Sequence, residues 1–457
     1  MDTSTQLFLN ILLFLAFGLA GMAFTRGALI LLILFIVSQG LGFIAPEHFT
    51  VAGLFDVHAL VLLIGAIITC VSVARWGELR YSWCFPSLLV FGALWVFAVM
   101  LPVSREHSDL FLAIKASKEF LIIFLFIPVF LFVRTEKDIR WGWYFLLFLG
   151  GYYSFQEIIS QVGGESLISI WNYDFRHEEP FFWKIYPPFW PVILLAFLVY
   201  VYEISLAGKK HIGRAFLNGS GLLLTFFRSY LLATVAVIPV MLFLAGQSFS
   251  RTFIKTFAVA VFVCVLVLSI AIGTGGTFEM VDQLSQKFLV SGVTEFHTDS
   301  GGALAGRKLV ARERWTVLNS SPMVGFGFID KNSPFGWRIK HNIRGNLLGM
   351  IDMGYLDMAL KFGLVGSSVL ILAVTGFLIS MVMTVRRTTD IGLKSRALAT
   401  ASMICVYFIV LPVHAPLTNS FGLLPLSLAL ALVERERLLK KKSEFLSVGQ
   451  HGKARTV

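Results

Sequence analysis

The sequence predicts an all-α polytopic membrane protein with about 12–13 transmembrane helices and one large extracytoplasmic loop that forms a helical cap. Of its 457 residues, 57% are hydrophobic and only 14% are charged, whereas a soluble domain carries roughly 25% charged residues. The mean hydropathy is +0.79. Apolar runs cover most of the chain, and one long polar segment, residues 276–360, separates them.

Each apolar run approaches the roughly 20 residues that an α-helix needs to cross the hydrocarbon layer. The runs are expected at 6–24, 27–45, 52–74, 85–102, 118–134, 141–162, 188–207, 213–227, 229–247, 253–274, 364–385, 397–413 and 417–434. They divide the chain into four parts. These are transmembrane helices in 1–275, the large periplasmic loop in 276–360, C-terminal transmembrane helices in 361–434, and a basic cytoplasmic tail in 435–457. The tail from Lys440 is expected to lack regular structure.

The positions of the basic residues predict the orientation. The net charge is +11, from 38 Lys and Arg against 27 Asp and Glu. If the long loop is outside, almost every other basic loop falls on the cytoplasmic side, as the positive-inside rule requires. These loops include Arg75 and Arg80, Arg251 and Lys255, Arg386 and Arg387, and the tail. Much of the charge is therefore a topology signal, and no nucleic-acid partner is expected.

The long polar segment carries most of the candidate chemistry. Arg307, Arg312 and Arg314 are predicted on a short helix, which the glycine-rich turn 322–327 follows. Arginine binds phosphate oxygens through two parallel hydrogen bonds, and a glycine-rich turn lets backbone N–H groups approach an anion. The segment is therefore expected to face an anionic substrate.

Two further arginines stand out by position. Arg228 lies alone between two apolar runs on the predicted outer face, where it either binds an anion or extends to the membrane interface. Arg176 lies in a loop rich in charged and aromatic residues, where an ion pair with Glu178 or Glu179 is the alternative to a role in binding. The aromatic residues of that loop fit either an interfacial belt or a platform for sugar rings.

Three residues are candidates for proton transfer. Asp352 lies at the start of an amphipathic helical pattern, where a carboxylate serves equally well as a helix cap or as a general base. His341 and His414 titrate near neutral pH, but a lone histidine also serves structural roles. No metal or cofactor is expected, because the four cysteines lack metal-ligand spacing and no Walker A, His-Glu-x-x-His or Gly-x-Ser-x-Gly motif occurs.

Four motifs, in this order, resemble those of the O-antigen ligase and O-antigen polymerase superfamily of bacterial membrane glycosyltransferases. They are Phe175-Arg176 through Pro187-Pro188; Gly221-Leu-Leu-Leu-Thr225-Phe-Phe-Arg228-Ser229; Gly306-Arg307 with Trp315 and Pro322-x-x-Gly325-x-Gly327; and Asp352-Met-Gly-Tyr355-Leu356 through Gly363-Leu-Val-Gly366. The family's ligases place a histidine where this chain has Asp352, and His341 comes earlier in this sequence. The resemblance therefore leaves Asp352 or His341 as the base and favours a polymerase over a ligase.

The resemblance implies an O-antigen or exopolysaccharide polymerase of the bacterial inner membrane, with its active face outside. Such an enzyme transfers glycan from a polyprenyl-diphosphate-linked oligosaccharide to an acceptor glycan or glycolipid, without metal or cofactor. Arg176, Arg228 and Arg307 would hold the diphosphate and stabilise the charge that develops on the leaving group, with Arg228 as a catalytic residue. A flippase and a chain-length regulator are expected partners, besides membrane lipid. An O-antigen ligase acting on lipid A–core is the alternative, and a polysaccharide or lipid transporter is the third, although ionisable residues within the membrane runs are scarce.

Overall fold

Helices account for nearly all of the structure that the computed structural model describes. The described residues are 20–41, 56–168, 175–178, 182–185, 189–208, 211–225, 227–246, 303–330 and 353–453, with the single positions 18, 187, 333, 335 and 336. The expected membrane run at 253–274 and much of the long loop therefore lie outside the described residues. So does the first expected run, apart from its last few positions.

Most of the described helices overlap the predicted apolar runs, but the run expected at 118–134 is divided among three helical segments, and one described helix lies in the polar segment 276–360. The helices are α2 (Ala28–Val37), α3 (Val57–Val71), α4 (Phe85–Ser104), α5 (Leu110–Leu121), α6 (Phe126–Phe132), α7 (Glu136–Ile168), α8 (Pro191–Ala207), α9 (Ile212–Leu224), α10 (Arg228–Leu244), α14 (Ala303–Leu318), α16 (Gly354–Arg387), α17 (Ile391–Val410) and α18 (Ser420–Lys453). The 3-10 helix η2 (Val73–Tyr81) follows α3, and η3 (Ile122–Leu125) joins α5 to α6. Asp56, Asp109 and Asp390 cap the starts of α3, α5 and α17 through side-chain hydrogen bonds.

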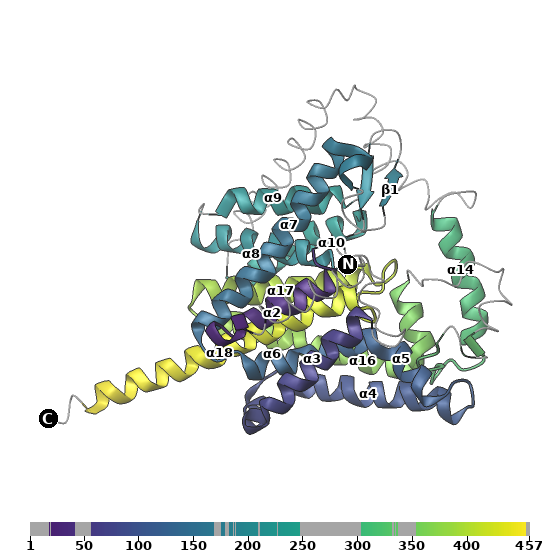
Figure 1. Cartoon of the computed structure of the whole chain (residues 1–457), viewed down its shortest axis with the longest axis horizontal. Helices are drawn as coiled ribbons and strands as arrows, with labels where there is room; N and C mark the ends of the chain where they lie inside the picture. The colour runs from purple at the N-terminus through teal and green to yellow at the C-terminus, as the bar shows by residue number, and fades with distance from the viewer. Residues whose placement is uncertain are drawn as a thin grey trace, which may run out of the picture.

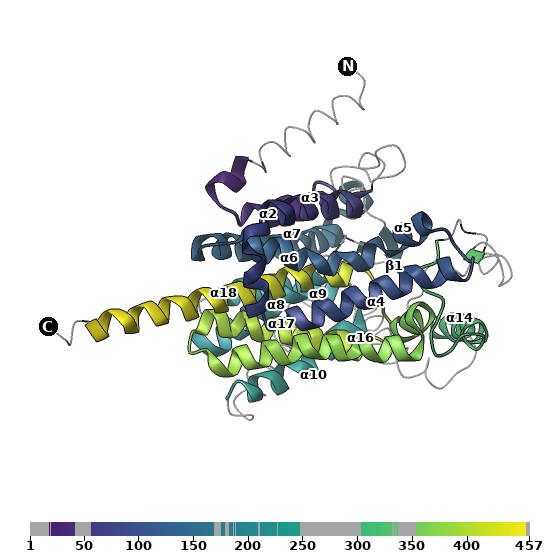
Figure 2. The ribbon, with the colours of Figure 1, turned by 90° about the horizontal axis from the view of Figure 1, so that it is seen from below.

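Two helices, α8 and α18, form the centre of the bundle. Every residue of α8 from Pro191 to Tyr202 is buried, as is every residue of α18 from Gly422 to Glu436. A helix that is apolar on all sides needs neighbours on all sides, and Figure 2 shows α18 running between layers of other helices. By contrast, α4 and α16 each keep an exposed apolar face, with Leu89 and Leu372 among its members.

The described helices indicate a membrane protein. Three of them, α4, α16 and α17, are long and apolar enough to cross a membrane. A fourth span is possible by the same criteria if α3 and η2, which meet at a bend of 95°, are taken as one broken span. Helices α2, α8 and α10 are apolar but shorter. The predicted total of about 12–13 spans and the orientation of the bundle stay predictions.

Among the described residues, the helical fold is joined by one short hairpin that the sequence did not predict. The strands β1 (Phe175–Glu178) and β2 (Phe182–Ile185) pair antiparallel between α7 and α8. The hairpin is consistent with the β-propensity of the aromatic residues in this loop. Its register places Arg176 opposite Lys184.

The C-terminal tail also differs from its prediction. Instead of losing regular structure at Lys440, α18 continues to Lys453, and Figure 1 shows it projecting beyond the other helices. Ion pairs stabilise the helix where it leaves the bundle: Lys440 Nζ lies 3.1 Å from a Glu436 carboxylate oxygen one turn earlier and 2.6 Å from Asp390 at the start of α17. The expectation of a tail without structure was therefore wrong.

Charged residues tie the helices together at the end of the bundle from which α18 projects, here called the basic end. Glu434 is fully buried; its carboxylate accepts hydrogen bonds from Arg437 (2.9 Å) and from the Trp83 backbone N–H (2.8 Å). Arg435 Nε donates to the Val133 carbonyl at 2.8 Å, and its Nη1 bonds the Glu78 carboxylate at 2.5 Å. Each arginine in this network has a carboxylate partner from the chain itself.

A carboxylate also fixes the connection between α2 and α7 at this end. Asp138 accepts backbone N–H groups from Arg26 (2.8 Å), Arg134 (3.1 Å) and Thr135 (3.0 Å). Burial alone would raise the pKa of this carboxyl, but the hydrogen bonds to its ionised form outweigh burial and lower the pKa below the usual aspartate value. Asp138 is therefore ionised in the folded protein at neutral pH.

Candidate functional site

The N-terminal ends of four helices meet at the opposite end of the bundle, here called the polar end. His58, near the start of α3, has its Nε2 2.9 Å from Oγ of Ser420, the first residue of α18. Its ring also lies 6.3 Å from that of Phe189, just before α8. Trp190 stacks at 4.3 Å on Phe227, the residue before α10. Since helix N-termini carry partial positive charge, this end favours negatively charged ligands.

An aromatic cluster joins the start of α10 to the connection between α17 and α18. The His414 ring lies 5.5 Å from that of Phe227 and 5.1 Å from that of Tyr230. The first residue of α16, Gly354, donates its N–H to the Leu411 carbonyl at 2.8 Å, and a Cβ on Gly354 would collide with the His414 carbonyl. The motifs at 221–229 and 352–366 therefore approach each other through the His414 segment, although they lie far apart in the chain.

A buried carboxylate lies in the first turns of α16. Asp357 is 6% exposed and accepts hydrogen bonds from the Thr418 hydroxyl and, at 2.7 Å, from Lys361 Nζ. Thr418 lies just before α18, so this contact ties the start of α16 to the start of α18. The pair of Asp357 and Lys361 adds one negative and one positive charge to the polar end.

The most unusual side chain of this region is that of Arg314 on α14. It is only 7% exposed, and its Nε and Nη2 are buried without a hydrogen-bond partner among the described residues. Helix α14 packs on α16 through an apolar cluster that includes Leu318, Leu356 and Ala359. Burial lowers the pKa of the Arg314 guanidinium, while the nearby Asp357 carboxylate acts to raise it. The group still carries its charge at neutral pH, because arginine keeps its proton in proteins.

The glycine-rich turn docks into a break in α16. At Gly363 the backbone leaves the helical conformation, with φ 66° and ψ −178°, which frees carbonyl groups of α16. Three backbone hydrogen bonds then join the segments: Phe326 N–H to Leu360 O (2.8 Å), Gly327 N–H to Lys361 O (2.9 Å) and Leu364 N–H to Pro322 O (2.8 Å). The glycine-rich turn at 322–327 and the motif at 352–366 therefore belong to one structural unit.

This docking corrects the expectation that the glycine-rich turn cradles an anion. The N–H groups of Phe326 and Gly327 already bond α16, and that of Phe328 donates to the Ala98 carbonyl of α4 at 2.8 Å. Arg105 holds the turn as well, because its Nη1 donates to the Gly325 carbonyl at 2.9 Å. The turn therefore joins the end of α14 to α4 and α16, and the N–H groups of Phe326, Gly327 and Phe328 are not available to a ligand.

A further charged group of the polar end is the carboxylate of Asp56, which lies between α3 and α5. The Asp56 carboxylate bonds Lys118 Nζ and accepts the Ala59 N–H at 3.1 Å, and it lies 3.8 Å from His58 Nδ1. The hydrogen bonds from Lys118 and from the Ala59 N–H stabilise the ionised form of this carboxylate. Asp56 therefore stays negatively charged and orients the His58 ring toward Ser420.

The structure describes the predicted site residues only in part. Asp352 and His341 lie outside the described residues. Arg228 is the first residue of α10, Arg176 belongs to β1 and Arg307 belongs to α14, but their side chains lie outside the description. By backbone position, Arg228 follows Phe227 directly at the polar end, and Arg307 comes two helical turns before Arg314 on α14.

Several residues of the polar end were not singled out by sequence reasoning. Asp357 and Lys361 carry one available signal, since an acid and a base four residues apart share a helix face. Arg314 was one of several arginines in a polar segment, and no local pattern distinguishes the buried one from its exposed neighbour Arg312. The pairing of His58 with Ser420 joins positions 362 residues apart, so no local signal could predict it.

The described residues contain no group of three or more His, Cys, Asp or Glu side chains placed to hold a metal ion. A comparison with models of known protein families found no match, and a comparison with curated proteins found none either.

Proposed function

We propose that this protein is a membrane glycosyltransferase that elongates a polysaccharide from a polyprenyl-diphosphate-linked donor, with its active face at the polar end. The membrane would be the bacterial inner membrane, and the polar end would face outside, as the positive-inside rule predicts. The acceptor would be a hydroxyl group of a second glycan or glycolipid.

The observation that carries this proposal is the buried Arg314 guanidinium, whose Nε and Nη2 have no hydrogen-bond partner among the described residues. Burying an unpaired charge is costly, so such a group is retained where a ligand supplies the missing acceptor. A guanidinium presents its donors as a planar fork that matches phosphate oxygens. A diphosphate, with several anionic oxygens, satisfies these donors better than a neutral sugar does.

Two features of the backbone support an anion at the same end. The N-termini of α3, α8, α10 and α18 converge there, and their partial positive charges add to that of the guanidinium. In the hairpin, Arg176 and Lys184 occupy directly opposed positions. Two basic residues at one register position of a hairpin suit the binding of an anion.

The proposed reaction is a displacement at the anomeric carbon of the donor sugar. The acceptor hydroxyl loses its proton to a general base and forms the new glycosidic bond. The bond between the anomeric carbon and the diphosphate oxygen breaks, and the polyprenyl diphosphate leaves with the electron pair. Arg314, with Arg176, Arg228 and Arg307, would stabilise the charge that grows on the leaving oxygen.

The base in this proposal is Asp352 or His341. Asp352 is two residues from Gly354, which packs against the His414 segment at the polar end. This placement of the adjoining backbone supports Asp352 as the base. The His414 ring packs edge-on against Phe227 and tilted against Tyr230, which fits a positioning role for the cluster.

The test is glycan analysis in a strain that lacks the gene, complemented with variants of the chain. Arg314→Ala should lower chain extension by about 10²–10³-fold, the usual effect of removing one donor to developing negative charge. Arg312→Ala is the matched control, because Arg312 is an exposed arginine of the same helix. The Arg312→Ala variant should extend the glycan chain as the wild type does. If the Arg314→Ala variant is present in the membrane and extends the glycan chain as far as the wild type does, Arg314 is not part of the site.

The same strain separates the candidate activities. Single repeat units that persist on the lipid carrier indicate a lost polymerase. Long chains stranded on the carrier, with unmodified lipid A–core, indicate a lost ligase, and the base would then be assigned to His341. An unchanged outer glycan pool would reject both transferase activities.

A further inference from the structure

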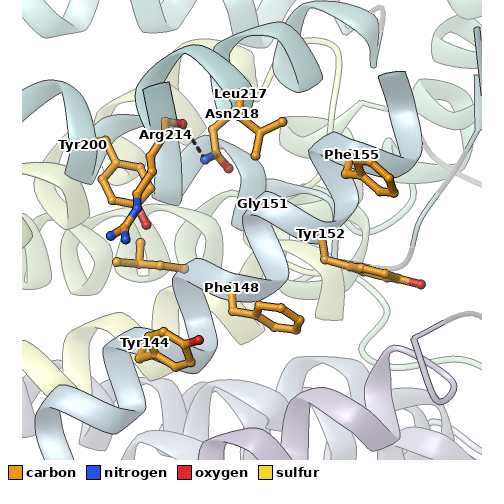
Figure 3. Close-up of a pocket in the computed structure, with 10 residues that line it drawn as sticks. Tyr144, Phe148, Gly151, Tyr152, Phe155, Tyr200, Arg214, Leu217 and Asn218 are labelled. Atoms are coloured by element: carbon orange, nitrogen blue, oxygen red, sulfur yellow. Dashed lines mark hydrogen bonds between the residues drawn. The ribbon is translucent and has the colours of Figure 1, made fainter. Parts of the chain in front are cut away.

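A groove separate from the polar end lies along the side of the bundle, between α7, α8 and α9. Its volume is about 440 Å³. Figure 3 shows an aromatic stripe of α7 along it, with Arg214 of α9 and Tyr200 of α8 near one end. The stripe consists of Tyr144, Phe148, Tyr152 and Phe155, spaced three or four residues apart on one face of the helix.

The groove is open to the side and mainly apolar. Tyr144, Phe148 and Phe155 are 57%, 48% and 50% exposed, although they belong to a long helix whose other faces pack in the bundle. The stripe spans about 16 Å, at a rise of 1.5 Å per residue. The groove residues include no acidic side chain. An exposed aromatic stripe of this length along a membrane protein faces lipid rather than water.

The cationic end of the groove is formed by Arg214. Its guanidinium carbon lies 5.9 Å from the centre of the Tyr200 ring, and in Figure 3 it points away from Phe155, toward the Tyr144 end. Helix α8 starts at the polar end, so its last residues and the first turn of α9, which carries Arg214, lie toward the basic end. Tyrosine and arginine together are typical of a position at the membrane interface.

In the deep part of the groove, the side chain of Asn218 already has its hydrogen-bond partners within the protein. Asn218 is 1% exposed; its amide donates to the Arg214 carbonyl at 2.8 Å, and its carbonyl oxygen accepts the Ser154 hydroxyl at 3.3 Å. With these bonds made inside the protein, the groove presents one cation at its mouth and apolar surface beyond it. This distribution matches a molecule with an anionic head and a hydrocarbon chain.

We infer that the groove binds an anionic phospholipid of the membrane leaflet at the basic end. The lipid phosphate pairs with Arg214, and one acyl chain lies along the aromatic stripe of α7. Charge complementarity selects the occupant, because the groove adds a fixed arginine to a face already rich in basic residues, which attract anionic lipids. The site lies away from Arg314, so it is independent of the proposed donor site.

The test measures thermal unfolding of the purified full-length chain in detergent with added lipid. Dioleoylphosphatidylglycerol, which is anionic, should raise the unfolding temperature more than zwitterionic dioleoylphosphatidylcholine does, since a ligand that binds only the folded state stabilises it. Arg214→Gln should abolish that difference. Arg80→Gln is the matched control: Arg80 also lies over a tyrosine ring, that of Tyr81 at 4.8 Å, but outside the groove, and it should keep the difference.

A second pair of variants tests the acyl-chain part. Gly151→Leu fills the groove, because a Cβ there meets only Leu217, at 3.8 Å; it should reduce stabilisation by the anionic lipid. Gly92→Leu, at a helical glycine outside the groove with a similarly ordinary contact to Phe124 at 3.7 Å, should not. Equal stabilisation by both lipids, or full stabilisation of Arg214→Gln, would overturn the inference. Stabilisation by a polyprenyl phosphate alone would overturn it too and assign the groove to the carrier lipid.

Discussion

The two ends of the bundle use arginine in opposite ways. At the basic end, Arg435 and Arg437 are nearly buried, and both bond carboxylates and carbonyl groups of the chain. At the polar end, Arg314 is buried to a similar extent, yet its Nε and Nη2 have no hydrogen-bond partner among the described residues. The same residue type therefore bonds other parts of the chain at one end, and at the other it keeps two buried nitrogens without a hydrogen-bond partner among the described residues.

The difference follows from what each end must do. A buried charge that has its partner within the chain contributes to specifying how the helices pack. A buried charge without one costs stability, and natural proteins keep such groups mainly where function needs them. This comparison predicts opposite responses to mutation at the two ends.

The largest expected effect is at the junction that holds the polar end together. Gly327 has φ 78°, a conformation that side chains disfavour, and a Cβ there would collide with the Ala98 carbonyl and with Pro102. Gly327→Ala should therefore undock the turn from α4 and sharply reduce the yield of folded protein, as measured by size-exclusion chromatography. Gly213→Ala, at a glycine of α9 with open space around it, should leave the yield unchanged.

The next largest effect is expected at the basic end. Glu434→Ala leaves the Arg437 guanidinium, whose side chain is 11% exposed, without its carboxylate, and it leaves the Trp83 N–H unpaired. Breaking a buried pair in this way costs about 3–5 kcal/mol. Chemical denaturation in detergent measures the loss. A stability equal to that of the wild type would show that the network at this end is not structural.

The sharpest comparison uses one substitution at both ends. Arg435→Met should lower stability by about 1–3 kcal/mol, because Glu78 and the Val133 carbonyl each lose a hydrogen bond. Arg314→Met should leave stability unchanged or raise it by about 1 kcal/mol, because a costly unpaired charge is removed, while glycan extension is lost. The unfolding temperatures of the two variants test this comparison. Equal destabilisation of both would contradict the distinction between the two ends.

The smallest effect is a pH dependence at the basic end. The pKa of Asp138 is lowered below the usual aspartate value, so its contribution to stability is fully present above the pKa of the unfolded state, about 3.9, and is lost as the pH falls through the folded pKa. Asp138→Asn should lower the unfolding temperature at pH 7 by about 1–3 °C and reduce the drop between pH 5 and pH 3. An identical drop in the variant and the wild type would assign acid sensitivity to other carboxylates.

Hydropathy predicted most of the helices because the apolar content of a segment can be read from that segment alone. The expected runs at 85–102 and 188–207 correspond to α4 and α8 within a few residues. The tail was predicted wrongly, since ion pairs of Lys440 with Asp390 and Glu436 extend α18 there. The hairpin at 175–185 was missed for a similar reason: strand pairing depends on a partner segment, and composition showed only a polar loop with aromatic residues.

By itself, the sequence determined that this is a largely helical membrane protein with an arginine-rich polar segment, because these features depend only on composition and local periodicity. The tertiary structure alone decided which charges are paired. The partners Arg435 and Glu78 lie 357 residues apart in the sequence. The glycine-rich turn and the break in α16 are separated by about 40 residues, and nothing in the sequence between them indicates that they are in contact. The burial of Arg314, whose Nε and Nη2 lack a hydrogen-bond partner among the described residues, is likewise a property of the packed molecule, because only packing removes water from one arginine and leaves Arg312, two residues away, exposed.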